Sequence, residues 1–126
     1  MNVIRQFMHL IVFSLLFGFS VWSSANESPC DALYEQIMKP GFDDAAAGRR
    51  VAECYEQGLQ KDSRDQGGDA EAYYRIGVAR YFTAASSGDI AEMEKSRDAL
   101  QKAVDLDSEH AAARDQLMKA EGWINP

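Results

Sequence analysis

The sequence predicts an all-α fold, a short array of antiparallel helix hairpins. Apolar residues recur at helical spacing through most of the chain after residue 28, as on the buried face of an amphipathic helix. Beyond the N-terminal segment, the chain has no alternating apolar–polar pattern and no long run of Val, Ile and Thr, so strands are not expected. Clusters of turn-forming residues divide this part into five helical segments.

The first segment is expected to begin at Ser28-Pro29, because serine caps helices and proline suits the first helical position. Lys39-Pro40-Gly41 ends it. The residues of its apolar face are Cys30, Leu33, Tyr34, Ile37 and Met38.

A second helix is expected from Asp43 or Asp44 to about Gln60. The residues of its inner face are Ala47, Val51, Cys54, Tyr55, Gly58 and Leu59. The stretch from Lys61 to Asp69 is rich in turn formers, and we expect a solvated loop there. Its acidic residues do not alternate as an EF-hand calcium loop requires, so no calcium site is expected.

The third and fourth helices are separated by the turn formers Ser86-Ser87-Gly88. Asp69 is expected to cap the third helix, which continues to about Ala85. Asp89 is expected to cap the fourth, which ends at Asp105 or Leu106.

Asp107-Ser108 turns the chain into a fifth helix, whose apolar side is expected to consist of Leu117, Met118 and Trp123. The fourth helix also repeats the second weakly. Asp107-Ser108 aligns with Asp62-Ser63, as a stacked array of hairpins would show.

The segment 1–25 has the order of a secretory signal. Arg5 lies in a short basic start, an apolar stretch from Phe7 to Trp22 follows, and Ser23-Ser24-Ala25 supplies small residues for cleavage. We expect cleavage after Ala25, which leaves residues 26–126 as one helical domain in a periplasmic or secreted protein. An uncleaved membrane anchor is the alternative, although a spanning helix needs about 20 apolar residues and this run is shorter.

Charge and cysteine content narrow the class of protein. With 20 acidic and 13 basic residues, the chain carries a formal net charge of −7. An acidic chain without a basic run is a poor binder of nucleic acid or of anionic membranes.

Two cysteines in an exported chain suggest one disulfide, between Cys30 and Cys54; two buried free thiols are the alternative.

No motif of a known catalytic type is found. His110, the one histidine of the expected mature domain, lies beside Glu109 at the start of the fifth helix, where we expect it to be in solvent. Acidic pairs such as Asp43-Asp44 suit helix N-termini, which favour negative charge. We therefore expect no enzyme, no metal site and no cofactor, while a hydrolase with two separated carboxylates stays a minor alternative.

Residues 70–108 carry an ordered set of aromatic and small residues. Its members are Tyr73, Ile76, Gly77, Ser96, Leu100 and Ala103. In this order and spacing the segment resembles a tetratricopeptide repeat, whose small residue lets the two helices of a hairpin pack closely. Arg80 stands where the family pattern has Tyr, Ser108 stands where it has Pro, and the hairpin is longer than usual. The resemblance implies that residues 109–122 form a capping helix and is weaker over residues 29–63.

The resemblance also implies that one side of the third helix lines a groove for a partner protein or peptide. The candidate binding residues are Glu71, Tyr74, Arg75, Val78, Tyr81 and Phe82. Tyrosines provide rigid contact area and a hydroxyl group. Packing of this side on the first hairpin or under the fifth helix is the alternative.

We therefore expect an exported adaptor or scaffold for another protein. A small secreted inhibitor or effector is one alternative. A structural envelope protein that self-assembles, for example as a homodimer, is another.

Overall fold

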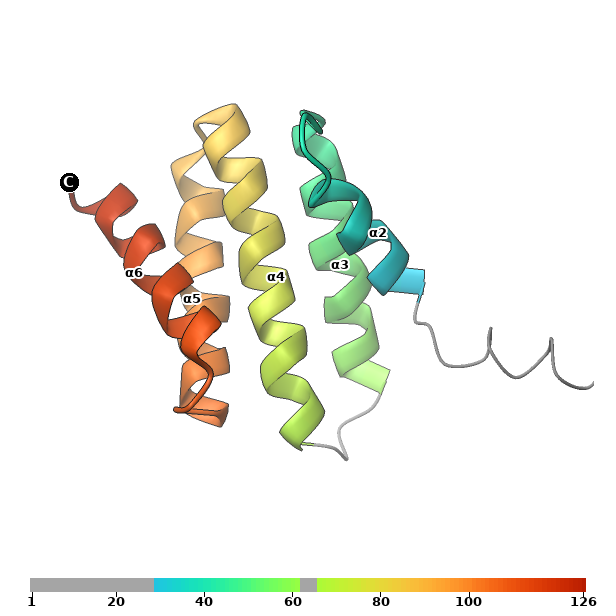
Figure 1. The fold of residues 1–126 in the computed structure, drawn as a ribbon, viewed down its shortest axis with the longest axis vertical. Coiled ribbons are helices and arrows are strands. Elements are labelled where there is room, and N and C mark those ends of the chain that lie inside the picture. The colour runs from blue at the N-terminus through green and yellow to red at the C-terminus, as the bar shows by residue number, and fades with distance from the viewer. Residues whose placement is uncertain (1–28, 62–65) are drawn as a thin grey trace, which may run out of the picture.

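The computed structural model describes residues 29–61 and 66–126, which form five helices (Figure 1). The helices are α2 (Pro29–Ile37), α3 (Ala45–Lys61), α4 (Gln66–Ser87), α5 (Ile90–Leu106) and α6 (Ala111–Ile124). Successive helices run up and down across the molecule, and no strand occurs in the described ranges, so the predicted all-α hairpin array is confirmed. The predicted signal segment 1–25 and the predicted cap at Ser28 lie outside the described residues.

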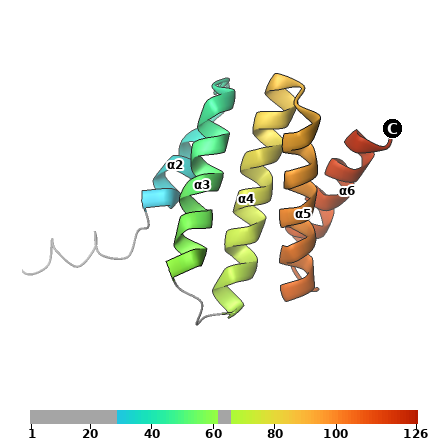
Figure 2. The ribbon, with the colours of Figure 1, turned by 180° about the vertical axis from the view of Figure 1, so that it is seen from behind.

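Helix α4 is the centre of the array. It contacts each of the other four described helices, and α3 and α5 flank it. Helices α2 and α6 lie on one side of the α3–α4–α5 row, toward the viewer in Figure 1 and away from the viewer in Figure 2. A helix covered from several directions is apolar around much of its circumference. This explains why α4 buries Ile76, Val78, Ala79 and Ala84, which point in different directions.

Two aspartates cap the starts of helices, and of these Asp89 was predicted as a cap. The Asp44 carboxylate accepts a hydrogen bond from the Ala46 N–H at 3.0 Å and caps α3. The Asp89 carboxylate accepts one from the Ala91 N–H at 3.0 Å and caps α5. Gly88, with φ of 74°, makes the turn between α4 and α5 in a conformation that glycine adopts without strain.

Both ends of the expected loop from Lys61 to Asp69 are helical, and its residues 62–65 lie outside the described residues. Lys61 is the last residue of α3 and Gln66 the first of α4, so the prediction that Asp69 caps this helix is wrong. Glycine disfavours a helix interior by about 1 kcal/mol, which made Gly67-Gly68 a loop signal. Helix continuation instead keeps the backbone N–H and C=O groups paired, which a loop would leave to water.

Two apolar clusters join the helices. The first comprises Ile37, Ala47, Val51, Ala52, Ile76 and Ala79, from α2, α3 and α4. The second comprises Ala84, Met93, Leu100, Leu117 and Ala120, from α4, α5 and α6. Because α4 contributes to both clusters, it connects the two halves of the array.

Four residues predicted on apolar faces stay exposed. Leu33 of α2 is 37% exposed and Met38, directly after this helix, is 55% exposed; Met118 and Trp123 of α6 are 64% and 37% exposed. The buried stripe of α6 consists of Ala113, Leu117 and Ala120 instead. Among the described helices, α2 and α6 are the outermost and pack on one side only, so a narrow stripe of each is buried.

Glycines let α4 approach the two flanking helices, α3 and α5, closely. A Cβ atom at Gly77 would lie 2.7 Å from Cδ2 of Leu100 on α5. A Cβ atom at Gly48 of α3 would lie 2.5 Å from the carbonyl oxygen of Ala79 on α4. Both distances are shorter than any ordinary van der Waals contact, so only glycine fits at either position.

We expect Gly48→Ala to destabilise the fold by about 1–3 kcal/mol, as overpacking of a filled core does. The new Cβ would meet a backbone oxygen of α4, which cannot rotate away. Gly58→Ala is the matched control on the same helix, because a Cβ there would meet nothing within 4 Å. This exposed glycine, predicted on the inner face of α3, should tolerate alanine with a gain of up to about 1 kcal/mol. Urea unfolding followed by circular dichroism compares the variants, and equal midpoints would contradict the close α3–α4 contact.

Cys30 and Cys54 form the predicted disulfide, with their Cα atoms 5.6 Å apart, so the alternative of two free thiols is wrong. The bond links α2 to α3. Helix α2 has nine residues and buries only Cys30 and Ile37, so the disulfide is a main attachment of this short helix to the array.

Candidate functional site

Arg75 of α4 is the centre of the candidate site. Its guanidinium donates to the Asp31 carboxylate of α2 at 2.6 Å and to the Tyr55 hydroxyl of α3 at 3.0 Å. Its Nε donates to Glu71, one turn earlier in α4, at 3.1 Å. The guanidinium also lies 5.1 Å from the ring centroid of Tyr34, a distance at which a cation is attracted to an aromatic face. Arg75 therefore joins three helices on one side of the molecule.

In this cluster the arginine is charged and the two tyrosines are neutral at physiological pH. Burial lowers the pKa of Arg75, but hydrogen bonds to Tyr55 and Glu71 outweigh burial and the pKa is raised. Burial raises the pKa of Tyr34 and of Tyr55 to about 12 in each case, and for Tyr55 the hydrogen bond to Asp31 adds to the effect. The tyrosines are therefore neutral donors at physiological pH, and Tyr55 donates to Asp31 at 2.5 Å.

His110 extends the same side of the molecule to the start of α6. Its Nε2 lies 2.8 Å from a Glu71 carboxylate oxygen, and its Nδ1 accepts a hydrogen bond from the Ala113 N–H at 3.1 Å. The imidazole packs tilted against the Tyr74 ring, with 4.8 Å between centroids. The side chain is 15% exposed, so the expectation that it would be in solvent is wrong. The docking of α6 on α4 covers it.

We name this surface the tyrosine face. Its residues are Asp31, Tyr34, Tyr55, Glu71, Tyr74, Arg75, Tyr81 and His110. Tyr74 and Tyr81 pack against the apolar cluster that includes Leu117 of α6, yet both side chains stay half-buried. Part of each ring is therefore accessible beside α6.

The structure places the predicted binding residues in two groups. Those that lie on the tyrosine face are Glu71, Tyr74, Arg75 and Tyr81. Val78 is 8% exposed and belongs to the interior beneath that face. Phe82 packs against Phe42 between α3 and α4, with 6.0 Å between ring centroids, and does not join the others.

Sequence reasoning missed Asp31, Tyr34, Tyr55 and His110 as members of this surface. They come from other helices and meet α4 only after the helices have packed. Their only local signals were helix-start positions and apolar spacing, and both of these indicate structure rather than a site.

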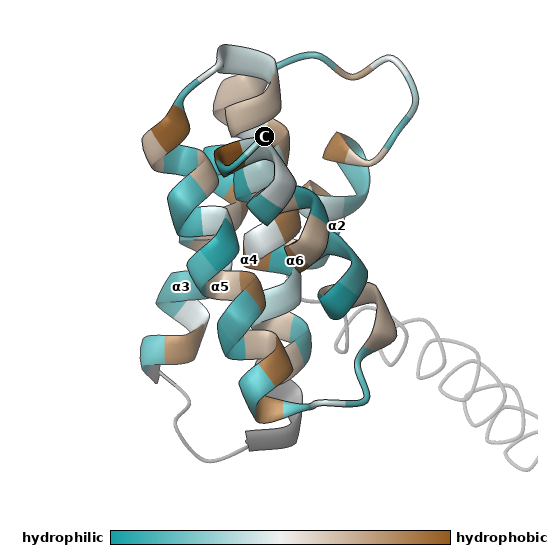
Figure 3. Cartoon of the chain, turned by 90° about the vertical axis from the view of Figure 1, so that its left-hand side faces the viewer, coloured by the Kyte–Doolittle hydropathy of each residue, from teal (hydrophilic) through white to brown (hydrophobic). Residues whose placement is uncertain are grey.

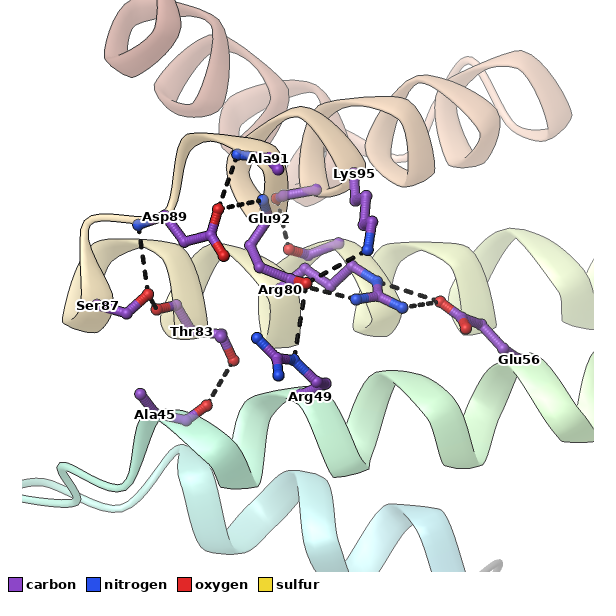
Figure 4. A network of polar contacts seen from close by, with 12 residues as sticks. Ala45, Arg49, Glu56, Arg80, Thr83, Ser87, Asp89, Ala91, Glu92 and Lys95 are labelled. Atoms are coloured by element: carbon purple, nitrogen blue, oxygen red, sulfur yellow. Dashed lines mark hydrogen bonds and ion pairs between the residues drawn. The ribbon is translucent and has the colours of Figure 1, made fainter.

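Arg80 lies on the opposite side of α4 and forms a buried ion-pair network (Figure 4). Its guanidinium donates to Glu92 of α5 at 2.8 Å and to Glu56 of α3 at 2.6 and 3.1 Å. Arg49 and Lys95 also pair with Glu92, at 3.7 and 3.4 Å. The network links α3 and α5, the two helices that flank α4.

The Arg80 network stays charged although it is buried. Burial raises the pKa of Glu92, but the hydrogen bond and charge of Arg80 outweigh burial, and the pKa of Glu92 is lowered. A shallow hollow of about 420 Å³ adjoins the network, with a rim of both signs of charge that includes Glu56, Asp98, Lys95 and Lys102. Because Arg80 and Glu92 satisfy each other, we assign the network a structural role.

The fold and the tyrosine face define a small all-α array of antiparallel helices with a half-buried aromatic and charged surface. Comparisons with protein-family models, with curated proteins and with solved structures find no match for this chain. In the ranges 29–61 and 66–126, no helix has the length and hydropathy needed to span a membrane. In the same ranges, no three side chains of His, Cys, Asp and Glu gather closely enough to hold a metal ion.

Proposed function

We propose that this protein is an exported adaptor of tetratricopeptide-like architecture that binds a partner protein or peptide on its tyrosine face. Two antiparallel hairpins, α2–α3 and α4–α5, followed by the single helix α6, support the architecture. The close contact of Gly77 with Leu100, at two positions of the repeat-like pattern, supports it as well. The signal-like order of residues 1–25 and the disulfide support export, since disulfides persist in oxidising compartments.

The partial exposure of the tyrosine face is the observation that carries the proposed binding. The side chains of Arg75 and Glu71 are 29% and 49% exposed, whereas that of Arg80 on the other side of α4 is 9% exposed. Tyrosine and arginine are enriched among the residues that contribute most to protein–protein binding. Hydrogen bonds hold Arg75 and Glu71 in place, which reduces the entropy lost when a partner binds.

Self-association is a second candidate, which the exposed residues of the α6 end favour. Figure 3 looks onto this end, where Met118 and Trp123 are exposed. In stacked arrays such apolar residues are covered by the next repeat. A homodimer in light scattering, lost in Met118→Glu, would support this candidate, and a monomer at all concentrations would exclude it.

We expect the double substitution Tyr74→Phe and Tyr81→Phe to reduce partner capture about thirtyfold. The rings would keep their packing on α6, while two hydroxyl groups would be lost, each worth about 1 kcal/mol in a typical hydrogen bond. Tyr73→Phe is the matched control, because Tyr73 lines the hollow on the opposite side of α4. Crosslinking capture from the native source, quantified by mass spectrometry, measures the effect. Equal capture by the double variant and by wild type would remove the tyrosine face as the binding surface.

A further inference from the structure

His110 uses both of its ring nitrogens in hydrogen bonds of fixed direction. Nδ1 lies 3.1 Å from the Ala113 backbone nitrogen, and a backbone N–H can only donate, so Nδ1 carries no proton. The single proton of the neutral ring is therefore on Nε2, which donates to Glu71 at 2.8 Å. One tautomer satisfies both contacts.

A second proton on the imidazole would have to bind Nδ1. The resulting N–H would point at the Ala113 N–H, which places two donors against each other and removes the N-cap of α6. The imidazolium would also stand at a helix N-terminus, where the unpaired N–H groups already create a positive field. Both effects destabilise the first turn of α6.

Titratable and charged groups of three elements surround His110. The titratable and charged groups on the elements around His110 are Glu71 and Tyr74 of α4, Asp107 and Glu109 of the α5–α6 connection, and Arg114 of α6. One Glu71 carboxylate oxygen lies against Nε2 of His110, and the other is paired with Arg75. The Asp107 carboxylate accepts from the Glu109 N–H at 3.0 Å. Protonation of Nδ1 removes the acceptor of the Ala113 N–H, and the contacts of the surrounding groups do not include that N–H.

We propose that His110 is an acid-sensitive helix cap, whose protonation releases the first turn of α6 from α4. Tyr74 loses its contact with the imidazole when this turn opens, so the wall of the tyrosine face that α6 provides becomes mobile. The release of α6 stands on the His110 geometry alone. Only its effect on partner binding rests on the proposed function.

Nuclear magnetic resonance of the intact chain tests the cap between about pH 8 and about pH 5, the range in which histidine changes charge. At the upper end we expect the Nε2–H tautomer of His110. Toward the lower end we expect the exchange protection of the Ala113 amide, corrected for intrinsic rates, to fall about fivefold, as for a lost N-cap. Protection of the central α4 amides should stay unchanged. An Nδ1–H tautomer at the upper pH, or constant protection of Ala113, would overturn the proposal.

His110→Asn is the matched variant, because asparagine caps helices and takes up no proton in this range. We expect the Ala113 amide of this variant to keep its protection at both pH values. The same acid response in His110→Asn would overturn the role of the imidazole. Partner capture by wild type at about pH 8 tests the proposed binding function independently of the cap. Failed capture together with an intact cap response would reject the binding function and leave the cap.

Discussion

Arg80→Met is expected to lower the free energy of unfolding by about 3–5 kcal/mol, the cost of removing one partner of a buried ion pair. Glu92, which is 4% exposed, would lose Arg80, the cation that lies nearest to its carboxylate. Arg49 and Lys95 cannot replace Arg80, because their side chains are 51% and 59% exposed and lie 3.7 and 3.4 Å from Glu92. Chemical denaturation of the variant and of wild type measures the loss.

Two further variants separate the ion pair from other effects of the Arg80 substitution. Arg80→Met combined with Glu92→Leu should recover much of the loss, since an apolar replacement of both partners leaves no buried charge. Arg75→Met is the matched control on the other side of α4, where Asp31 and Glu71 are accessible to water at 36% and 49% exposure. Its cost should be nearer about 1 kcal/mol. A cost for Arg80→Met no larger than that of Arg75→Met would contradict the buried network.

The same ion pair predicts acid sensitivity of the fold. Because the folded-state pKa of Glu92 is lowered, its contribution to stability is present above the pKa of the unfolded chain, ordinarily about 4.3 for glutamate. That contribution is lost as the pH falls through the lower folded-state pKa. The Arg80→Met, Glu92→Leu variant should lack this part of the acid destabilisation.

Reduction of the Cys30–Cys54 disulfide is expected to lower the thermal midpoint by about 10–20 °C. The bond closes a loop with a sequence separation of 24, which is worth about 3 kcal/mol in the chain-entropy account. Amides of α2 should lose protection from exchange before those of α4, because α2 is short and its other links to the array are few. Calorimetry with and without reductant, combined with hydrogen exchange, measures both effects.

The variant Cys30→Ala with Cys54→Ala provides the control for the reductant. It should melt near the midpoint of the reduced wild type and should not respond to reductant. A wild-type midpoint that is the same in both redox states would rule out a stabilising role of the bond. Since α2 carries Asp31 and Tyr34, reduction should also disorder one edge of the tyrosine face.

Local features of the sequence determined the helices. Asp89 caps α5 as predicted, and α3 begins directly after Asp44, at its predicted start, because a cap depends only on the two or three residues that follow it. Gly88 directly follows the last residue of α4, and its positive φ is a conformation that depends only on the residue itself. The disulfide followed from counting cysteines in a chain with a signal-like start. The Gly67-Gly68 segment was misassigned, since its local propensity was outweighed by the pairing of the backbone within α4.

Only the tertiary structure decided which residues meet. Arg75 and Asp31 are 44 residues apart in the chain, and His110 and Glu71 are 39 apart, so no helical period connects them. Periodicity assigns a residue to one side of its own helix and is silent about the helix that covers that side. For this reason Met118 was predicted on the apolar side of its helix, and that position is exposed. His110 was predicted to be in solvent and is covered by the contact of α6 with α4.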